Sequence, residues 1–105
     1  MAGKDARALS MLSISAKAGK LVSGSFMTER ALQDGSARLV IIAGDASDNT
    51  KKKFSNKSDY YRVPHFIFSS SEELGSHIGK GDRTSLAITD EGLAKSIMNI
   101  LEQEV

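Results

Sequence analysis

A few residues of this sequence invite a catalytic interpretation, but their neighbours do not support one. Gly79-Lys80-Gly81 places a lysine between glycines, as phosphate-binding loops do, yet no Ser or Thr follows the lysine and a helix is expected before it. His65 and His77 lack the spacing of metal ligands, and no Gly-x-Ser-x-Gly turn presents a nucleophilic serine. Cysteine is absent, which excludes thiolate chemistry. We therefore expect a protein that is not an enzyme and uses no cofactor, metal or small-molecule substrate.

Charge is distributed unevenly along the 105 residues, although the formal net charge is only +1. Residues 1–62 hold eleven Lys and Arg against six Asp and Glu, whereas residues 63–105 hold three against seven. Such a division can produce one basic face that suits a polyanion such as a nucleic acid. It can equally occur on an ordinary solvated surface, so charge alone leaves both interpretations open.

The length of the chain is typical of one domain, expected to span residues 1–105. No apolar run approaches the roughly 18–20 residues that a membrane span requires. The first residues also lack the apolar stretch of a signal peptide. We expect a cytoplasmic protein without a membrane partner.

Helical and extended patterns alternate along the sequence. Gly24-Ser25 is expected to open a helix that runs through Gln33, with Ser25 as its cap and Gly35 as its stop. Residues 39–43 are apolar without alternation, which predicts a central strand covered on both faces. Ser70 and Glu73 form a capping-box pattern at the start of a short helix. The other expected elements are a helix over 5–18 ending at Gly19, strands over 20–23, 65–68 and 86–88, a helix over 48–60 before Pro64, and a last helix capped by Thr89 or Asp90 that buries Leu93, Ile97, Ile100 and Leu101.

This alternation predicts an α/β fold, a three-layer α/β/α sandwich with a four-stranded mixed sheet. The sequence has no linker, internal repeat or low-complexity tract that would divide it.

Several segments, taken in order, resemble a known family. They are KAGKLVSG at 17–24, RALQDG at 30–35, ARLVIIA at 37–43, DAS at 45–47, NTKKK at 49–53, YYRVP at 60–64, ELG at 73–75, IGK at 78–80 and AITDEGLA at 87–94. Over residues 8–100 the chain resembles the ribosomal protein L-seven-Ae / L-thirty-e superfamily, and most of all its short bacterial branch of YlxQ-type ribosomal-protein-like proteins. Members of the superfamily have the sandwich fold and bind kink-turn RNA, a sharply bent duplex.

The resemblance implies that the N-terminus of the helix after Gly24 docks beside the sheared G·A pairs of the bend. A helix N-terminus offers free N–H groups and positive potential to phosphate, and a glycine allows two backbones to approach closely. Carried over by position, the RNA-facing residues are Lys20, Gly24, Ser25, Phe26, Met27 and Arg30. Of these, Lys20 and Arg30 would contact phosphate.

Phe26-Met27 departs from the family, whose members have Asn-Glu or a similar polar pair there to bind guanine edges. Val22 and Ser23 also stand where lysine is common in the family. Phe26 could stack on an unpaired base, since aromatic platforms are frequent in RNA recognition. Alternatively, Phe26 contributes to the core or to a protein contact. We favour a core position for Met27 and leave Phe26 open.

A second contact implied by the resemblance is the loop before the last strand. Here it carries Lys80, Arg83 and Thr84, of which the two cations could pair with phosphates, while Asp82 would be repelled. A solvated loop is an equal alternative. Asp45 follows the central strand, and the resemblance assigns it a capping or bracing task beside the RNA.

Two further groups suggest RNA contacts but are expected to serve other purposes. Lys51-Lys52-Lys53 cannot share one face of a helix, so an exposed solubilising helix is favoured. Tyr60 and Tyr61 could stack bases, but their position before Val63-Pro64 favours packing.

Together these observations favour a non-catalytic, ribosome-associated protein that recognises kink-turn-like RNA. The expected partner is structured RNA, with ribosomal RNA as one candidate, and a monomer is the expected state. The alternative is a protein-interaction module that has kept the fold and lost kink-turn recognition, because exposed apolar residues often mark protein interfaces.

Overall fold

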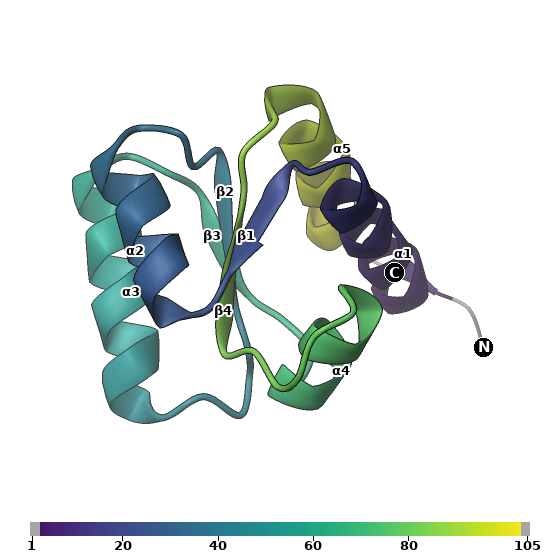
Figure 1. Cartoon of the computed structure of the whole chain (residues 1–105), viewed down its shortest axis with the longest axis horizontal. Helices are drawn as coiled ribbons and strands as arrows, with labels where there is room; N and C mark the ends of the chain where they lie inside the picture. The colour runs from purple at the N-terminus through teal and green to yellow at the C-terminus, as the bar shows by residue number, and fades with distance from the viewer. Residues whose placement is uncertain (1–2, 104–105) are drawn as a thin grey trace.

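The computed structural model describes residues 3–103, which form a three-layer sandwich with a four-stranded sheet as its middle layer (Figure 1). In chain order the elements are α1 (Lys4–Lys17), β1 (Leu21–Ser23), α2 (Ser25–Gln33), β2 (Leu39–Ile42), α3 (Asp48–Tyr60), β3 (His65–Ile67), α4 (Ser71–His77), β4 (Ser85–Ile88) and α5 (Glu91–Glu102). The predicted α/β/α sandwich with a mixed sheet is confirmed. Within residues 3–103, no helix has the length and apolar character that crossing a membrane requires.

The strand order in the sheet is β1-β4-β2-β3, and β4 runs antiparallel to both of its neighbours. Among the strands of the described residues, only β2 and β3 pair in parallel, with Val40 opposite His65. Every residue of β2 and β4 is buried, because helices cover both faces of these central strands. The edge strands β1 and β3 are only partly buried.

The helices are divided unequally between the two faces of the sheet (Figure 1). Helices α2 and α3 cover one face, whereas α1, α4 and α5 cover the other. Large apolar side chains from both helical layers and from the sheet fill the core, among them Leu12, Leu32, Ile41, Phe54, Leu74 and Ile97. Packing of α1 with α4 and α5 also places its basic Arg7 and Lys17 beside the acidic C-terminal helices. The basic and acidic halves of the sequence therefore do not become two opposite faces.

Most helix ends follow the predicted local chemistry. Gly19 adopts φ 72° after α1, and the amide of Lys20 donates to the carbonyl of Ser15, closing a Schellman turn. The hydroxyl of Ser70 and the carboxylate of Asp90 accept from the third amide of their helices.

Two expectations about helices were wrong. Ser25 is the first helical residue rather than the cap of α2, and the cap position belongs to Gly24. In α5 the fully buried residues are Ala94 and Ile97, while Leu93, Ile100 and Leu101 remain partly exposed. These three side chains are partly buried and pack against the core.

Candidate nucleic-acid interface

The N-terminus of α2 is open. Gly24 has φ 92° and ψ 158°, a conformation that only glycine adopts without strain, and no side chain caps the helix. The amide of Gly24 donates to the carbonyl of Ser85 at 2.9 Å, and that of Thr28 donates to the carbonyl of Gly24 at 2.9 Å. In the described part of the chain, nothing accepts from the three amides between them, those of residues 25–27. These amides and the helix dipole give the tip a positive potential that suits a phosphate.

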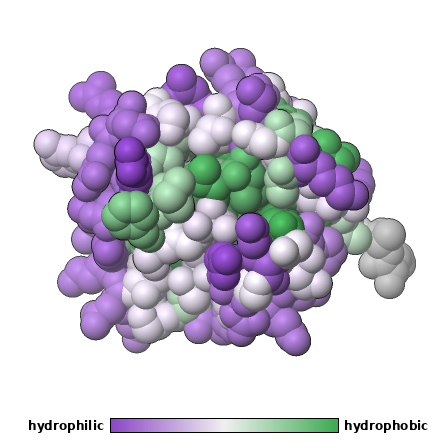
Figure 2. Space-filling view, in the orientation of Figure 1, coloured by the Kyte–Doolittle hydropathy of each residue, from purple (hydrophilic) through white to green (hydrophobic). Residues whose placement is uncertain are grey.

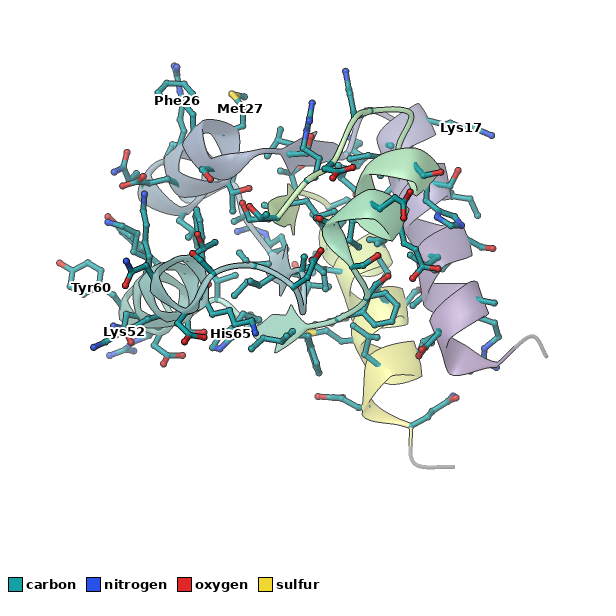
Figure 3. The ribbon with its side chains drawn as sticks, turned by 90° about the horizontal axis from the view of Figure 1, so that it is seen from below. Lys17, Phe26, Met27, Lys52, Tyr60 and His65 are labelled. Atoms are coloured by element: carbon teal, nitrogen blue, oxygen red, sulfur yellow. The ribbon has the colours of Figure 1, made fainter. Side chains whose placement is uncertain are left out.

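The sequence of α2 places one stripe on the sheet and the opposite stripe in solvent. Thr28, Ala31 and Leu32 are buried. At about 100° per residue, Phe26 and Arg30 lie nearly opposite this stripe, whereas Met27 lies at its flank. Phe26 is 71% exposed and Met27 is 42% exposed, and both project from the helix away from the sheet (Figure 3). The preference for a core position of Met27 was therefore wrong.

Hydroxyl groups beneath the tip connect α2 to the sheet. Ser85 and Thr28 are both fully buried, and the Oγ of Ser85 donates to the Oγ1 of Thr28 at 3.3 Å. Together with the bond from the amide of Gly24 to Ser85, this contact fixes the first turn of α2 against the start of β4. The helix tip is thus held directly beside the loop that leads into β4.

That loop, residues 79–84, is held by Arg83. Its Nε donates to the Oγ of Ser23 at 3.1 Å, and its Nη1 donates to the carbonyl of Asp82 at 3.0 Å. The guanidinium is partly buried, whereas Lys80 is exposed. Arg83 therefore ties the loop to the end of β1, and Lys80 is the cation of this loop that a ligand can reach freely. Thr84 contributes its carbonyl, which accepts from the amide of Ala43 at 2.9 Å.

A close contact between two backbones also positions the loop. Gly75 on α4 faces Gly81 so closely that a Cβ at Gly75 would lie 1.9 Å from the carbonyl oxygen of Gly81. The amide of Lys80 donates to the carbonyl of Gly75 at 2.8 Å across the same contact. Only a residue without a side chain fits at Gly75, which makes this glycine a structural requirement of the loop.

Asp45 braces the start of α4. Its Oδ1 accepts from the amide of Ser71 at 2.8 Å, and its Oδ2 accepts from the Oγ of Ser71 at 2.9 Å. These bonds, first the one from the amide, hold the pKa of the Asp45 carboxyl below its ordinary value. The carbonyl of Ser71 in turn accepts from the amide of Arg83 at 3.0 Å. Asp45 therefore supports the loop through Ser71, which agrees with the expected bracing task.

Lys20 is the one predicted residue that the structure places apart from the tip. The amide of Thr89 donates to the carbonyl of Lys20, so Lys20 lies beside the end of β4, whereas Gly24 lies beside its start. Four residues of extended chain separate the two by about 13 Å. The start of α2, the turn after β2 and the loop before β4 meet at the lower end of the molecule in Figure 1. These segments carry the predicted residues Gly24, Ser25, Phe26, Met27, Asp45, Lys80, Arg83 and Thr84, and Arg30 lies one turn further along α2.

A comparison with known families confirms the resemblance seen in the sequence. A model of the ribosomal protein L7Ae/L30e/S12e/Gadd45 family matches residues 6–98. The chain belongs to this family. Over 100 residues it is 38% identical to the RNA-binding protein YlxQ of Enterococcus faecium, a match that covers 95% of this chain and 96% of the relative. The RNA-binding protein YlxQ of Bacillus subtilis is 37% identical over 92 residues, with 88% and 92% covered.

Solved structures of similar proteins show the same architecture as this family member. A protein of unknown function from Bacillus halodurans C has a TM-score of 0.89 and 31% identity, with 92% of this chain and 98% of that chain covered. A 15.5kD RNA binding protein from Giardia lamblia has a TM-score of 0.76 and 22% identity, with 89% and 80% covered. At that identity the second likeness concerns the fold alone.

Charges around the family member's helix tip are mixed. The carboxylate of Glu29 lies 3.1 Å from the Nζ of Lys53 and 3.2 Å from the Nζ of Lys57, and these two lysines lower its pKa. Part of the basic charge of α3 is therefore neutralised by α2. Lys52 points outward from α3 (Figure 3), as expected of a solubilising helix. Around the tip, Arg30 and Lys80 are exposed cations, and Asp82 is an exposed anion.

The sequence did not indicate the residues whose hydrogen bonds and close contacts support this site from within the fold. Ser23, Ser71 and Ser85 carry no individual signal in the sequence, since serine is common in loops and helix starts. Their partners come from distant parts of the chain. Gly75 could have been suspected, because glycine inside a helix weakens it unless another backbone approaches closely.

Proposed function

We propose that this protein binds structured RNA of the kink-turn type, and that it does so without catalysis, as a monomeric, ribosome-associated protein of the cytoplasm. The observation that carries the proposal is the tip of α2, where no group within residues 3–103 caps the helix or accepts from three amides, beside an exposed aromatic side chain. Membership in a ribosomal protein family and the printed names of the two YlxQ relatives support it.

In the proposed complex, the amides of α2 bind one phosphate of the bend, and Arg30 and Lys80 contact neighbouring phosphates. Such contacts fix the orientation of the RNA and carry no sequence information. Phe26 and Met27 cannot form the hydrogen bonds to guanine that a polar pair would form. Phe26 instead stacks on an unpaired base, which suits its outward position on the first turn of α2.

The proposal is tested by titrating a labelled kink-turn RNA and a straight duplex of the same composition, with binding measured by gel shift. We expect the kink-turn to bind more tightly. Arg30→Glu and Lys80→Glu should each weaken binding by about tenfold, because each replaces an attractive phosphate contact by a repulsive one. Lys95→Glu is the matched control, since it makes the same charge change on α5, across the sheet from α2. Equal affinity for both RNAs, or equal loss in all three variants, contradicts the proposal.

The alternative function, a protein-interaction module, is favoured by one specific observation. Phe26 and Met27 are both exposed, and Figure 2 shows apolar side chains over β1 and over the lower turn of α2. An apolar contact persists at high salt, whereas phosphate contacts weaken. If the protein binds neither RNA at low salt, RNA binding is contradicted and the protein-interaction function is favoured instead.

A further inference from the structure

A second surface rich in aromatic and cationic side chains lies at the other end of α2, about 13 Å from its tip. The residues around it belong to the end of α2, to the turn that follows, and to the segment after α3. Together they enclose a hollow of about 370 Å³, lined among others by Gln33, Arg38, Tyr61 and Arg62. This end of the molecule is the upper one in Figure 1, remote from the loop at 79–84.

Packing was expected for both Tyr60 and Tyr61; Tyr60 does not pack, whereas Tyr61 lines the hollow together with Val63 and Pro64. Tyr60 is 80% exposed and Tyr61 is 37% exposed. Tyr60 lies about 200° around α3 from the buried Ser58, so it must face solvent. The two rings meet edge to face with centroids 4.9 Å apart, and Tyr60 projects outward from α3 (Figure 3). One exposed ring braced by a second is a rigid platform on which a planar base can stack.

Two arginines add positive charge to the hollow. The Nη1 of Arg38 donates to the carbonyl of Gly35 at 2.9 Å, which orients the guanidinium and leaves its other N–H groups available. Arg62, exposed, adopts φ 60° where the chain leaves α3. Among the acidic groups near the hollow, Asp34 accepts from the amide of Ser36 at 2.9 Å, and the largely exposed Asp59 lies 3.7 Å from His65. The carboxylate of Asp34 is therefore engaged within its own turn, whereas Arg38 and Arg62 can bind a phosphate.

The outer face of α2 connects this hollow to the helix tip. Phe26, Arg30 and Gln33 follow the spacing i, i+4, i+7 and share one side of the helix. They line, with Glu29, a groove of about 450 Å³. Gln33 borders both the groove and the hollow, so the two form a continuous path that begins at Phe26 and ends beside Tyr61.

We propose that this path binds a single-stranded RNA segment that continues from the structured RNA, with its backbone along Arg30, Arg38 and Arg62 and one base stacked on Tyr60. The inference rests on the proposed function, because it places the structured RNA at the tip of α2. It adds a second RNA contact and a requirement for unpaired nucleotides. Aromatic faces accept any base, so this contact should tolerate sequence changes in the single strand.

The test compares a kink-turn RNA with blunt ends and the same RNA carrying an unpaired uridine tail on either strand. Binding is followed by fluorescence anisotropy of the labelled RNA. The tail on the correct strand should tighten binding by about five- to tenfold, as one stacked base and one phosphate contact can provide. Combining Tyr60→Ala with Arg38→Gln should abolish this gain and leave the affinity for the blunt RNA unchanged.

Two features of the chain sharpen the experiment. It contains no Trp and only two Tyr, so its tyrosine fluorescence reports on this surface; once the absorption of the RNA itself is corrected for, it should be quenched by the tailed RNA and not by the blunt one. Ile67→Ala and Lys95→Gln are matched controls that remove an exposed apolar group and an exposed cation elsewhere, and they should retain the gain. Tight binding of the blunt RNA without any gain from either tail overturns the inference and keeps the proposed function. A gain that survives in the double variant overturns it as well, whereas loss of all kink-turn binding in the wild type refutes the proposed function.

Discussion

Gly24 shows how much a single position contributes to the candidate interface. A side chain there would meet open space, so the glycine is not required by packing within the protein. Its φ of 92° is what excludes other residues, and any substitution would cost about 1–3 kcal/mol of strain. The missing side chain also leaves the amides of the helix tip accessible. Backbone geometry and access to a ligand therefore require the same residue.

Asp45 allows a prediction at this scale. Its pKa lies below the ordinary value of 3.8 because the folded protein donates two hydrogen bonds from Ser71 to the charged carboxylate. The unfolded chain therefore binds the proton more tightly, and the stabilisation is complete above 3.8 and lost as the pH falls through the folded pKa. Asp45→Asn should lower the urea midpoint at neutral pH. The difference from the wild type should shrink as the pH falls below 3.8. A difference that stays constant with pH would show that the charge of Asp45 is irrelevant.

At the scale of elements, the site depends on the way α2 and α4 are attached to the sheet. The tip of α2 is fixed by Ser85, and the loop before β4 is fixed by Ser23 and by Ser71. These bonds connect residues 57 to 61 positions apart in the chain, except for the shorter connection through Ser71. The interface is thus rigid, because serines of β1, α4 and β4 form hydrogen bonds to the tip of α2 and to the loop before β4.

Gly75→Ala tests this attachment. The added Cβ would lie 1.9 Å from the carbonyl oxygen of Gly81, so the loop or α4 must move. We expect a loss of about 1–3 kcal/mol of unfolding free energy, typical of overpacking. RNA binding should weaken too, because Lys80 moves with the loop. Urea denaturation and the gel shift measure both effects.

Gly92→Ala is the control for this substitution. The nearest atom to its added Cβ is the Oδ2 of Asp90 at 3.4 Å, an ordinary contact within the start of α5. This change should be neutral or stabilise the protein by up to about 1 kcal/mol. Equal destabilisation by the two alanines would show that the approach of Gly75 to Gly81 has no special role.

For the whole molecule, the sandwich brings distant segments to one end. The junction of β1 and α2, the turn after β2 and the loop before β4 meet at the lower end in Figure 1. The antiparallel pairing of β4 with β1 and β2 places the start of β4 between the ends of these two strands. Charge, by contrast, is mixed over the surface, because α1 packs among the acidic helices.

The salt dependence of RNA binding is a property of the whole molecule. With about three to five phosphate contacts, the logarithm of the affinity should fall with the logarithm of salt concentration with a slope of about −2 to −5. Anisotropy titrations at several salt concentrations provide the slope. Tyr60→Ala should leave it unchanged, and Lys80→Glu should reduce its magnitude by about one. An affinity that does not vary with salt would argue for the protein-interaction alternative.

The sequence by itself determined the fold class, the order of the elements and most helix ends. These features depend on apolar periodicity and on local capping by residues such as Gly19, Ser70 and Asp90, which need no distant partner. The family resemblance named the tip of α2 and the loop before β4 as RNA contacts, and the tertiary structure places these two segments side by side. The tertiary structure alone decided that Met27 and Tyr60 face solvent, that Arg83 is engaged by Ser23, and that Lys20 lies apart from Gly24. Each of these depends on which side of a helix meets the sheet, or on hydrogen bonds between segments far apart in the chain, and no local pattern encodes either.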